Sequence, residues 1–336
     1  MTDRFSDSGF NTGRRRVLRG TALLALGAAA GAMQCAFAQG YPSRAIRIIV
    51  PWGPGGLVDV GGRVVGDALQ KAFDHPTAVE NLPGAAGTLG AHQVAKATPD
   101  GHTLLMGTSS IAIDVAGGRA LPFDPTRDLA PVALVADTHS VLIVPPASPI
   151  KSVADLIGAA KTKPGELSYG TPGIGSPAHL FSELFAQSAG VRMLHVPYGR
   201  APVMNDLMGG RLDVMFATIP VALPQIRNGQ VRPLAVTSAR RFPLLPEVPV
   251  VSEAGVPGYQ ATQWLGVFVP AATPNEIVQR LHAEITKAIN SPAVASALQQ
   301  RGLDPRTGSP DEFKRVIAAD IQKWAQVIRA GNIKLA

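Results

Sequence analysis

The sequence predicts an α/β fold, because short apolar runs alternate with glycine- or proline-containing loops and with segments of helical periodicity. The clearest unit begins with the β-branched run 45–50, which stops at Pro51. A loop with three glycines, 53–56, follows it, and apolar residues then recur at helical spacing from Val60 to Phe73. Repeated units of this kind indicate a parallel or mixed sheet covered by helices. Further strands are predicted at 103–106, 141–144, 167–170, 214–217 and 234–237.

The composition limits the function classes. The chain has 336 residues, of which 46% are hydrophobic, so it can bury the cores of two domains or of one large domain, and dominant disorder is excluded. No run of lysine and arginine is long enough for a nucleic-acid-binding stripe, so we expect no nucleic-acid partner. Cys35 is the single cysteine, which excludes an internal disulfide and a cysteine-based zinc site.

Residues 1–38 are predicted to be an export signal. Arginines at positions 14–16 and 19 precede an apolar segment that is shorter than the roughly 20 residues of a membrane span. The small-x-small sequence that ends at Ala38 predicts cleavage before Gln39 and a periplasmic mature chain. Removal of five arginines and two aspartates leaves that chain with a net charge of +4. The twin-arginine and general secretion routes both stay open, as do an uncleaved anchor and lipidation.

Several helix starts are marked by capping residues. Asp59 is predicted to cap the first helix and to pair with Arg63 four residues later. Thr273 and Ser309 each precede a proline and are followed three positions later by glutamate, which is the capping-box pattern. We therefore expect helices to begin directly after these three residues.

Three glycine-containing loops follow predicted strands, at 53–59, 107–110 and 173–177. In sheets of this kind, ligands bind beyond the carboxyl ends of strands and close to helix N-termini. The backbone N–H groups there bind a carboxylate without a dedicated positive side chain. The sequence therefore predicts an anion site at these loops, with tight turns alone as the alternative.

Enzyme motifs are mostly absent. The first glycine loop lacks the third glycine of a dinucleotide-binding fingerprint, because Val58 stands there, and it lacks the lysine of a phosphate-binding loop. The loops around Ser109 and Ser176 fail the nucleophile-elbow pattern. The seven histidines show no metal-ligand spacing. We therefore predict a protein that is not an enzyme and holds no cofactor or metal, with an exported hydrolase that pairs either serine with His179 as the alternative.

Six segments carry a resemblance that covers the chain behind the signal: Pro42–Gly56, Val79–Gly87, Thr98–Leu104, Leu194–Tyr198, Leu244–Pro249 and Glu253–Tyr259. In this order they resemble the tripartite tricarboxylate transporter solute receptors, also called the Bug or TctC-like family. The resemblance implies a two-lobed periplasmic binding protein, type II-like, with a ligand cleft between the lobes. It implies a monomer that delivers a small organic anion to membrane transporter subunits, or alternatively to a sensing system. We expect lobe 1 at 41–143 plus 251–336, lobe 2 at 144–250, and a hinge strand at 234–237 or 264–269.

The resemblance also implies which residues hold the ligand. A lobe 1 loop, 55–59, and a lobe 2 loop, 171–176, grip a carboxylate from opposite sides of the cleft. The family usually has two hydroxyl side chains where Leu57 and Val58 stand, so we expect an apolar or aromatic body on the ligand. Arg200 is either a bidentate carboxylate partner or a plain surface residue. The full set of expected ligand-binding residues is Trp52, Gly55, Gly56, Leu57, Val58, Asp59, Thr108, Ser109, Thr171, Gly173, Gly175, Ser176, His179, Tyr198, Arg200 and Thr218.

Overall fold

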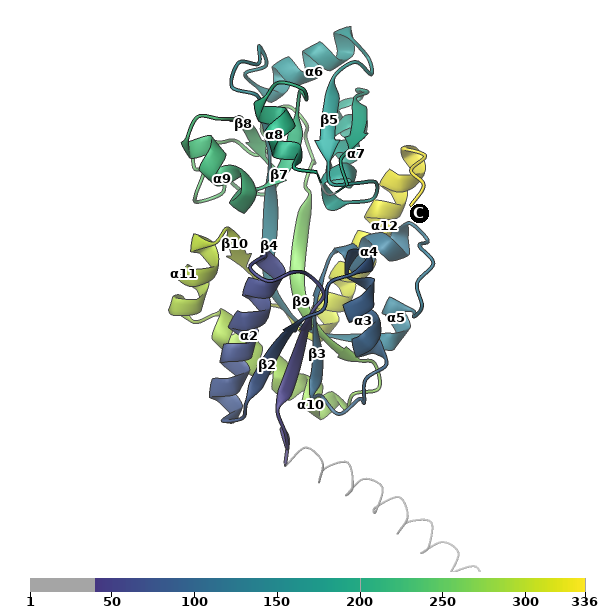
Figure 1. Cartoon of the computed structure of the whole chain (residues 1–336), viewed down its shortest axis with the longest axis vertical. Helices are drawn as coiled ribbons and strands as arrows, with labels where there is room; N and C mark the ends of the chain where they lie inside the picture. The colour runs from purple at the N-terminus through teal and green to yellow at the C-terminus, as the bar shows by residue number, and fades with distance from the viewer. Residues whose placement is uncertain (1–39, 200, 336) are drawn as a thin grey trace, which may run out of the picture. The chain divides into compact units, whose positions relative to one another are not determined.

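A computed structural model of the chain describes residues 40–199 and 201–335 (Figure 1). The chain divides into two units, 1–43 and 44–336. Within the described part of the first unit, the bond between Tyr41 and Pro42 is cis. The expected export signal with its cleavage site lies outside the described residues, and so does Arg200.

One part of the second unit, which we call lobe 1, is built on six strands in the order β10-β4-β9-β3-β1-β2 (Figure 1). β1 pairs in parallel with β2 and β3, whereas β9 is antiparallel to β3 and β4, so of the two predicted kinds of sheet, parallel or mixed, the mixed one is found. The strands are β1 (Ile46–Val50), β2 (Thr77–Asn81), β3 (Thr103–Thr108), β4 (Leu129–Val144), β9 (Thr262–Pro270) and β10 (Leu303–Pro305). The helical segments are α2 (Leu57–Phe73), η1 (Ala85–Gly87), α3 (Thr88–Ala95), α4 (Ser110–Ala116), α5 (Pro125–Asp128), α10 (Asn275–Ile289), α11 (Pro292–Gln300) and α12 (Pro310–Ala330).

The other part, lobe 2, uses the last residues of β4 as its central strand. There β4 pairs with β7 (Met215–Thr218) and β8 (Arg232–Val236), both antiparallel. A separate parallel pair, β5 (Ser168–Thr171) with β6 (Leu194–Pro197), completes the strands. The helices are α6 (Val153–Thr162), α7 (Pro177–Ala189), α8 (Val203–Met208) and α9 (Ile219–Arg227).

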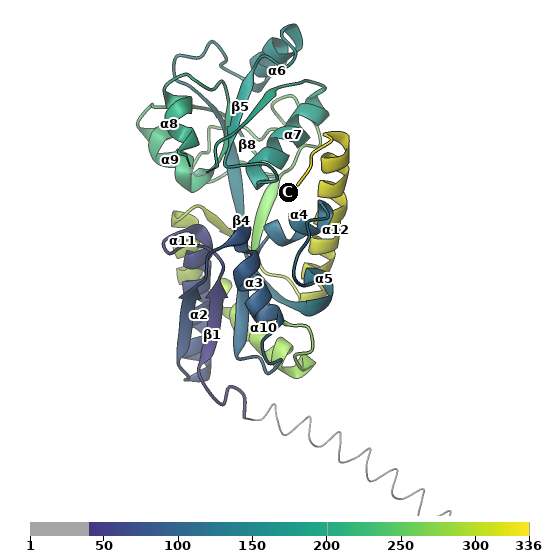
Figure 2. The same ribbon diagram turned by 45° about the vertical axis from the view of Figure 1, so that its right-hand side comes forward.

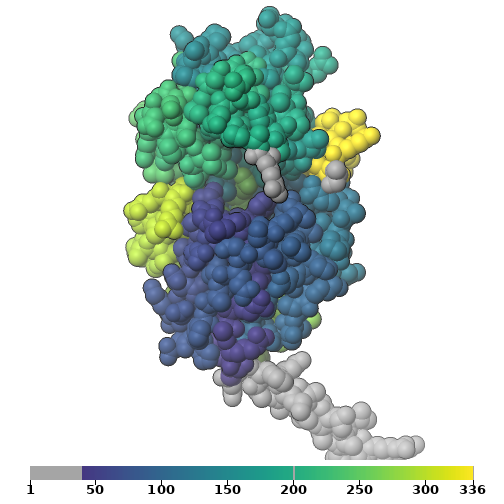
Figure 3. All heavy atoms as spheres, viewed as in Figure 1, coloured from purple at the N-terminus to yellow at the C-terminus, as the bar shows by residue number. Residues whose placement is uncertain are grey.

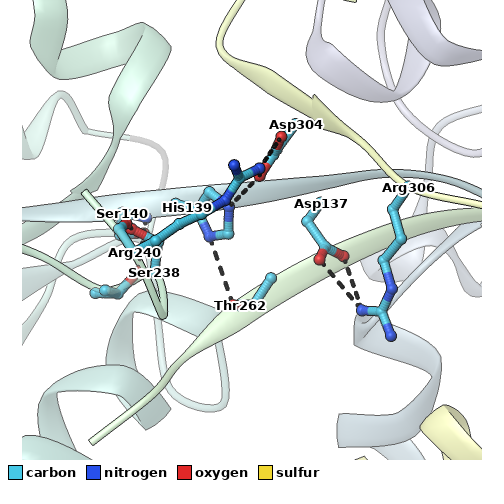
Figure 4. Close-up of polar contacts among 9 residues, drawn as sticks. Asp137, His139, Ser140, Ser238, Arg240, Thr262, Asp304 and Arg306 are labelled. Carbon is cyan, nitrogen blue, oxygen red and sulfur yellow. Dashed lines mark hydrogen bonds and ion pairs between the residues drawn. The ribbon is translucent and has the colours of Figure 1, made fainter. Parts of the chain in front are cut away.

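The chain crosses between the lobes at β4 and again just before β9. β4 pairs with β9 through His139 and with β7 from Ser140 onward. On the return, the Ala261 N–H donates to Thr237 O at 3.1 Å, and β9 starts at the next residue. Polar contacts surround these crossings, as Figure 4 shows. The lobe limits given above, 41–143 plus 251–336 for lobe 1 and 144–250 for lobe 2, stay a prediction.

Two ion pairs lie at the crossings. Arg240, which follows β8 of lobe 2, reaches Asp304 of β10 at 3.0 Å, and His139 lies 3.7 Å from the same carboxylate (Figure 4). On β4 itself, Asp137 pairs with Arg306 at 3.2 Å. The first pair joins the two lobes directly, because its members come from different lobes.

Helix α12 runs from lobe 1 to lobe 2, and Figure 2 shows it beside α4 and α7. Its Trp324 ring stacks on Phe181 of α7 with centroids 5.6 Å apart. The Gln187 amide of α7 donates to Val327 O at 3.0 Å. The C-terminal helix is therefore a third connection between the lobes.

The predicted capping boxes had different outcomes. The Ser309 hydroxyl accepts the Glu312 N–H at 3.1 Å, which confirms the prediction for α12. The prediction for Thr273 is wrong, because α10 has Pro274 at its N-cap and no side-chain cap. The Thr273 hydroxyl donates instead to the carbonyl of Pro270 at 2.7 Å, so it closes the turn that follows β9.

Candidate functional site

The lobe 1 loop is fixed by the carboxylate of Asp59. Gly55, whose φ of 81° lies in the left-handed region, donates its N–H to Asp59 Oδ2 at 3.0 Å. Arg63 Nε donates to the same oxygen at 2.9 Å, which confirms the predicted pair. Asn81 Nδ2 donates to Asp59 Oδ1 at 2.9 Å and to Trp52 O at 3.0 Å. One buried carboxylate therefore ties together the loop, the first helix and β2.

The prediction that Asp59 is the N-cap is wrong. α2 begins two residues earlier, at Leu57, and Gly56 is its N-cap without a side-chain cap. Asp59 is the third helical residue, and its carboxylate reaches back to the loop. Because Gly56 has no side chain, nothing in the sequence marks this start. Leu57 and Val58 consequently lie in the first turn of the helix, where backbone N–H groups have no intrahelical partner.

Burial and hydrogen bonding act in opposite directions on Asp59, which is 3% exposed. Burial alone would raise the pKa of its carboxyl group. The hydrogen bonds from Arg63, Gly55 and Asn81 together outweigh burial and hold the pKa below its usual value. The carboxylate is therefore ionised at neutral pH and stays with these donors.

Thr108 ends β3, and Ser109 follows it as the N-cap of α4. Ser109 is 1% exposed, and among the described residues its hydroxyl has no hydrogen-bond partner. Thr108 Oγ1 accepts the Ser110 N–H at 3.3 Å. With Trp52, Thr108 lines a small cavity of about 20 Å³, which has room for about one water molecule. A buried hydroxyl without a partner is available to donate a hydrogen bond.

The lobe 2 loop is fixed by Ser176 and His179. Ser176 caps α7, because its hydroxyl accepts the His179 N–H at 3.3 Å and donates to Gly173 O at 2.7 Å. Gly175, at φ 75°, donates its N–H to His179 Nδ1 at 3.1 Å. Thr171 Oγ1 closes the start of the loop on Gly173 O at 3.3 Å. The buried imidazole of His179 thus binds the loop backbone rather than lying open to solvent.

A stack of rings supports this loop. The His179 and His195 rings lie with centroids 3.8 Å apart, and Tyr169 stacks on His195 at 5.0 Å. His195 Nε2 lies 2.6 Å from Thr171 Oγ1. Burial, together with the neighbouring His195, lowers the pKa of His179 to about 4. Its ring is therefore neutral at pH 7, as an acceptor for the Gly175 N–H must be.

Two further expected residues, Tyr198 and Thr218, lie outside the two glycine loops. The Tyr198 N–H donates to Thr171 O at 2.9 Å, and its hydroxyl donates to Asp206 at 2.7 Å, so this side chain is bound within lobe 2. Thr218 ends β7 opposite Ser140 and precedes α9. The expected residues therefore form one group in each lobe, and Thr218 directly precedes α9.

A cavity of about 810 Å³ lies between the lobes, next to the first loop. This volume is within the roughly 300–1,000 Å³ of small-molecule sites. Figure 3 shows the molecule hollowed between the green atoms of lobe 2 and the purple atoms of the first loop and α2. The walls from α9 and from the turn after α11 were not predicted, since no local motif marks them. The lining residues are Gly55, Leu57, Asp59, Val60, Arg63, Pro220, Leu223, Pro224, Arg227, Asn228, Gln300, Arg301 and Gly302.

The geometry lacks the arrangement of a serine hydrolase. The Ser176 hydroxyl binds backbone groups, and the Ser109 hydroxyl has no partner, so neither is hydrogen-bonded to an imidazole. Within residues 40–199 and 201–335, no cluster of three or more metal-binding side chains occurs. In the same part of the chain, no helix combines the length and the apolar character needed to cross a membrane.

The sequence of the described residues identifies the family. Residues 62–333 match the tripartite tricarboxylate transporter family receptor (TctC). The chain belongs to this family. TctC receptors are periplasmic solute-binding proteins.

Relatives and solved structures agree with this assignment. The UPF0065 protein in the tcbD-tcbE intergenic region of Pseudomonas sp. (strain P51) is 39% identical over 320 residues, which cover 95% of this chain and 94% of that protein. The R. palustris protein solved with adipate is 36% identical, with a TM-score of 0.76 over 87% of this chain and 99% of that one. MatC from Rhodopseudomonas palustris, solved with bound malate, is 30% identical, with a TM-score of 0.73 over 86% and 100%. The predicted two-lobed binding-protein fold is confirmed.

Proposed function

We propose that this TctC receptor captures a small organic carboxylate with an apolar body and delivers it, as a monomer without catalytic activity, to membrane transporter subunits. The mature chain begins near Gln39 in this proposal and works in the periplasm. Two similar proteins of known structure carry adipate and malate, which supports a carboxylate ligand. The N-terminus of α2, whose first turn lines the cavity with Leu57 and Asp59, favours the same chemistry.

The observation that carries the proposal is the pair of glycine loops, one in each lobe. Each loop leads into a helix N-terminus, where the helix dipole favours a negative charge, and at α2 no side chain caps the N–H groups of the first turn. The loops are held rigidly by Asp59 and His179, so they need no reorganisation to receive a carboxylate. We place the ligand carboxylate between residues 55–59 and 171–176.

The apolar ligand body follows from the walls. Leu57 and Leu223 line the same cavity as Gly55, and they come from different lobes. A hydroxylated acid would leave its hydroxyl groups without partners against such side chains, which is costly. A hydrocarbon body instead loses water-exposed apolar area when the cleft closes.

Thermal unfolding of the refolded mature protein tests this proposal. Saturated and aromatic carboxylates are expected to raise the melting temperature, because a ligand at a hundredfold excess over Kd stabilises by about 2.7 kcal/mol. The matching amides, which have the same bodies without the charge, are expected to give no shift. Leu57→Ser should move the preference toward hydroxylated acids, with exposed Leu194→Ser as the control. A panel without any carboxylate-dependent shift would contradict the proposed function.

A further inference from the structure

The side chain of Leu335 contacts both lobes. Leu335 belongs to the short segment 331–335 that follows α12, and it is half-buried. A Cβ added at Gly117, the C-cap of α4 in lobe 1, would collide with Leu335 Cδ1 and lie 2.7 Å from Leu335 Cγ. A Cβ added at Gly175, in the lobe 2 loop, would collide with Leu335 Cδ2 and lie 3.5 Å from Cγ. Each methyl group of this one leucine therefore fills the space that a side chain would need at a glycine of a different lobe.

The turn that carries Leu335 is anchored at the end of α12. The Gly331 N–H donates to Val327 O at 2.9 Å, and the Gln187 amide of α7 donates to the same carbonyl at 3.0 Å. Figure 2 shows the end of α12 beside α4 and α7. The backbone that leads to Leu335 is therefore bound to lobe 2 as well as to its own helix.

On the lobe 1 side, the contact lies at the end of a helix that starts at an expected ligand residue. α4 spans Ser110–Ala116, with Ser109 as its N-cap and Gly117 as its C-cap. The Gly117 N–H donates to Ile113 O at 2.9 Å, and the Ile113 side chain belongs to the same buried core as Trp324 of α12. Because α4 is a short, packed helix, a displacement at Gly117 is passed on to Ser109.

On the lobe 2 side, Gly175 is held by two different contacts. Its N–H donates to the buried His179 ring at 3.1 Å, and its α-carbon packs against Leu335. A glycine at a φ of 75° has no side chain of its own to restrict the backbone. The hydrogen bond fixes the direction of the Gly175 N–H, whereas Leu335 limits how closely the loop approaches α4.

We propose that Leu335 is a positioning residue of the ligand site, because it sets the distance between the lobe 2 loop and lobe 1 and so holds residues 171–176 where a bound carboxylate needs them. This inference rests on the proposed function, which places the carboxylate between residues 55–59 and 171–176. Loss of the leucine side chain leaves a space beside both glycines into which the loop can move. A ligand must then order the loop as it binds, and that cost lowers the affinity.

Calorimetric titration of the mature protein with adipate and with hexanoate tests the inference. Leu335→Ala is expected to weaken the binding of both probes by about fivefold or more. Leu335→Met, which nearly conserves the volume, should bind within about twofold of the wild type. Ile333→Ala is the matched control, since Ile333 lies in the same segment and packs on the same core, while the side chain nearest to both glycines is that of Leu335. Its affinity should change by less than about twofold.

Hydrogen exchange of the unliganded protein supplies a readout that general destabilisation does not reproduce. In Leu335→Ala the amides of residues 171–176 are expected to exchange faster, whereas those of residues 53–59 keep their wild-type rates. Equal acceleration in both loops would show a global loss of stability and would overturn the inference.

A second variant leaves Leu335 in place. The φ of Gly117 is −87°, which alanine adopts without strain, so Gly117→Ala acts through its collision with Leu335. It should weaken the binding of both probes by about threefold or more. This variant tests the proposal even if Leu335→Ala does not fold.

The outcomes separate the inference from the function on which it rests. Wild-type affinity in Leu335→Ala or in Gly117→Ala would overturn the role of Leu335 and leave the carboxylate receptor intact. Equal weakening in Leu335→Ala and Ile333→Ala would also overturn it, because a general loss of packing would then explain both. If neither probe binds to the wild type, the proposed function is contradicted and the inference with it.

Discussion

The glycine loops of lobe 1 (53–59) and lobe 2 (173–177) share one construction with two different acceptors. In each loop a glycine in the left-handed region, Gly55 at φ 81° or Gly175 at φ 75°, donates its N–H to a side chain four residues later. The acceptor is the Asp59 carboxylate in lobe 1 and the His179 imidazole in lobe 2. In both cases a helix starts between donor and acceptor.

The difference between the acceptors lies in how they stay unprotonated. Asp59 is held in its charged form by three donors, whereas His179 is held neutral by burial. A second carboxylate placed in the lobe 2 loop would add a negative charge beside the ligand's own. A neutral imidazole performs the same bracing without that repulsion, so only one of the two loops carries a formal negative charge.

The largest expected effect is a loss of folding stability at low pH, to which the two acceptors, His179 and Asp59, contribute at different pH values. His179 titrates at its usual 6.5 in the unfolded chain and at about 4 in the folded protein. Between these values the unfolded chain binds more protons, so stability falls as the pH drops, by about 3 kcal/mol at pH 4. Asp59, whose pKa is lowered from 3.8, loses its contribution only below this window. Urea unfolding at pH 7 and pH 4 measures the loss.

His179→Asn is the control for the pH experiment. The Asn side-chain oxygen takes the place of Nδ1 as the acceptor for the Gly175 N–H, and it has no proton to gain above pH 4. The variant should therefore lose about 3 kcal/mol less than the wild type between the two pH values. An equal loss in both proteins would show that other groups titrate instead.

The next effect compares the two glycines. Gly55→Ala is expected to cost about 1 kcal/mol, since its positive φ is strained for alanine while the space around it is open. At Gly175 an added Cβ would also meet the side chain of Leu335, which raises the expected cost to about 2 kcal/mol. Chemical unfolding at pH 7 measures both. Equal costs would mean that Leu335 moves aside without penalty.

The smallest effect concerns the charge in lobe 1. Asp59→Asn should cost about 1 kcal/mol at pH 7, because its amide offers one acceptor oxygen to three donors. Arg63→Gln should cost less than Asp59→Asn, since the arginine is 54% exposed and solvent screens its ion pair. Thermal melts of both variants test this order. A larger cost for Arg63→Gln would show that the ion pair, rather than the backbone contact, fixes the loop.

Much of the fold could be predicted because its signals are local. The β-branched run before Pro51 and the helical spacing after it identify β1 and α2 without any distant contact. β2, β6 and β10 were not predicted, since β10 is three residues long and none of the three is a strong apolar run. The full length of β4 was also missed, because its pairing with β9 decides it.

In the site, too, the features marked by local sequence could be predicted and those that depend on distant segments could not. The glycine loops could be found because a turn needs glycine at positions such as 55 and 175. The exact start of α2 could not, since Gly56 has no capping side chain to reveal it. The cavity walls at Arg227 and Arg301 come from segments far apart in the sequence, and only the assembled lobes bring them to one cavity. No pattern within a short window contains that information.

The position of β9 also determines when the sheet of lobe 1 can form during synthesis. β9 lies between β3 and β4, so those two strands, made more than a hundred residues earlier, have no direct contact in the sheet. Until residues 262–270 have left the ribosome, both strands keep an unpaired edge and lobe 1 has no continuous sheet. A nascent chain of this receptor therefore stays incompletely folded until its final part is made.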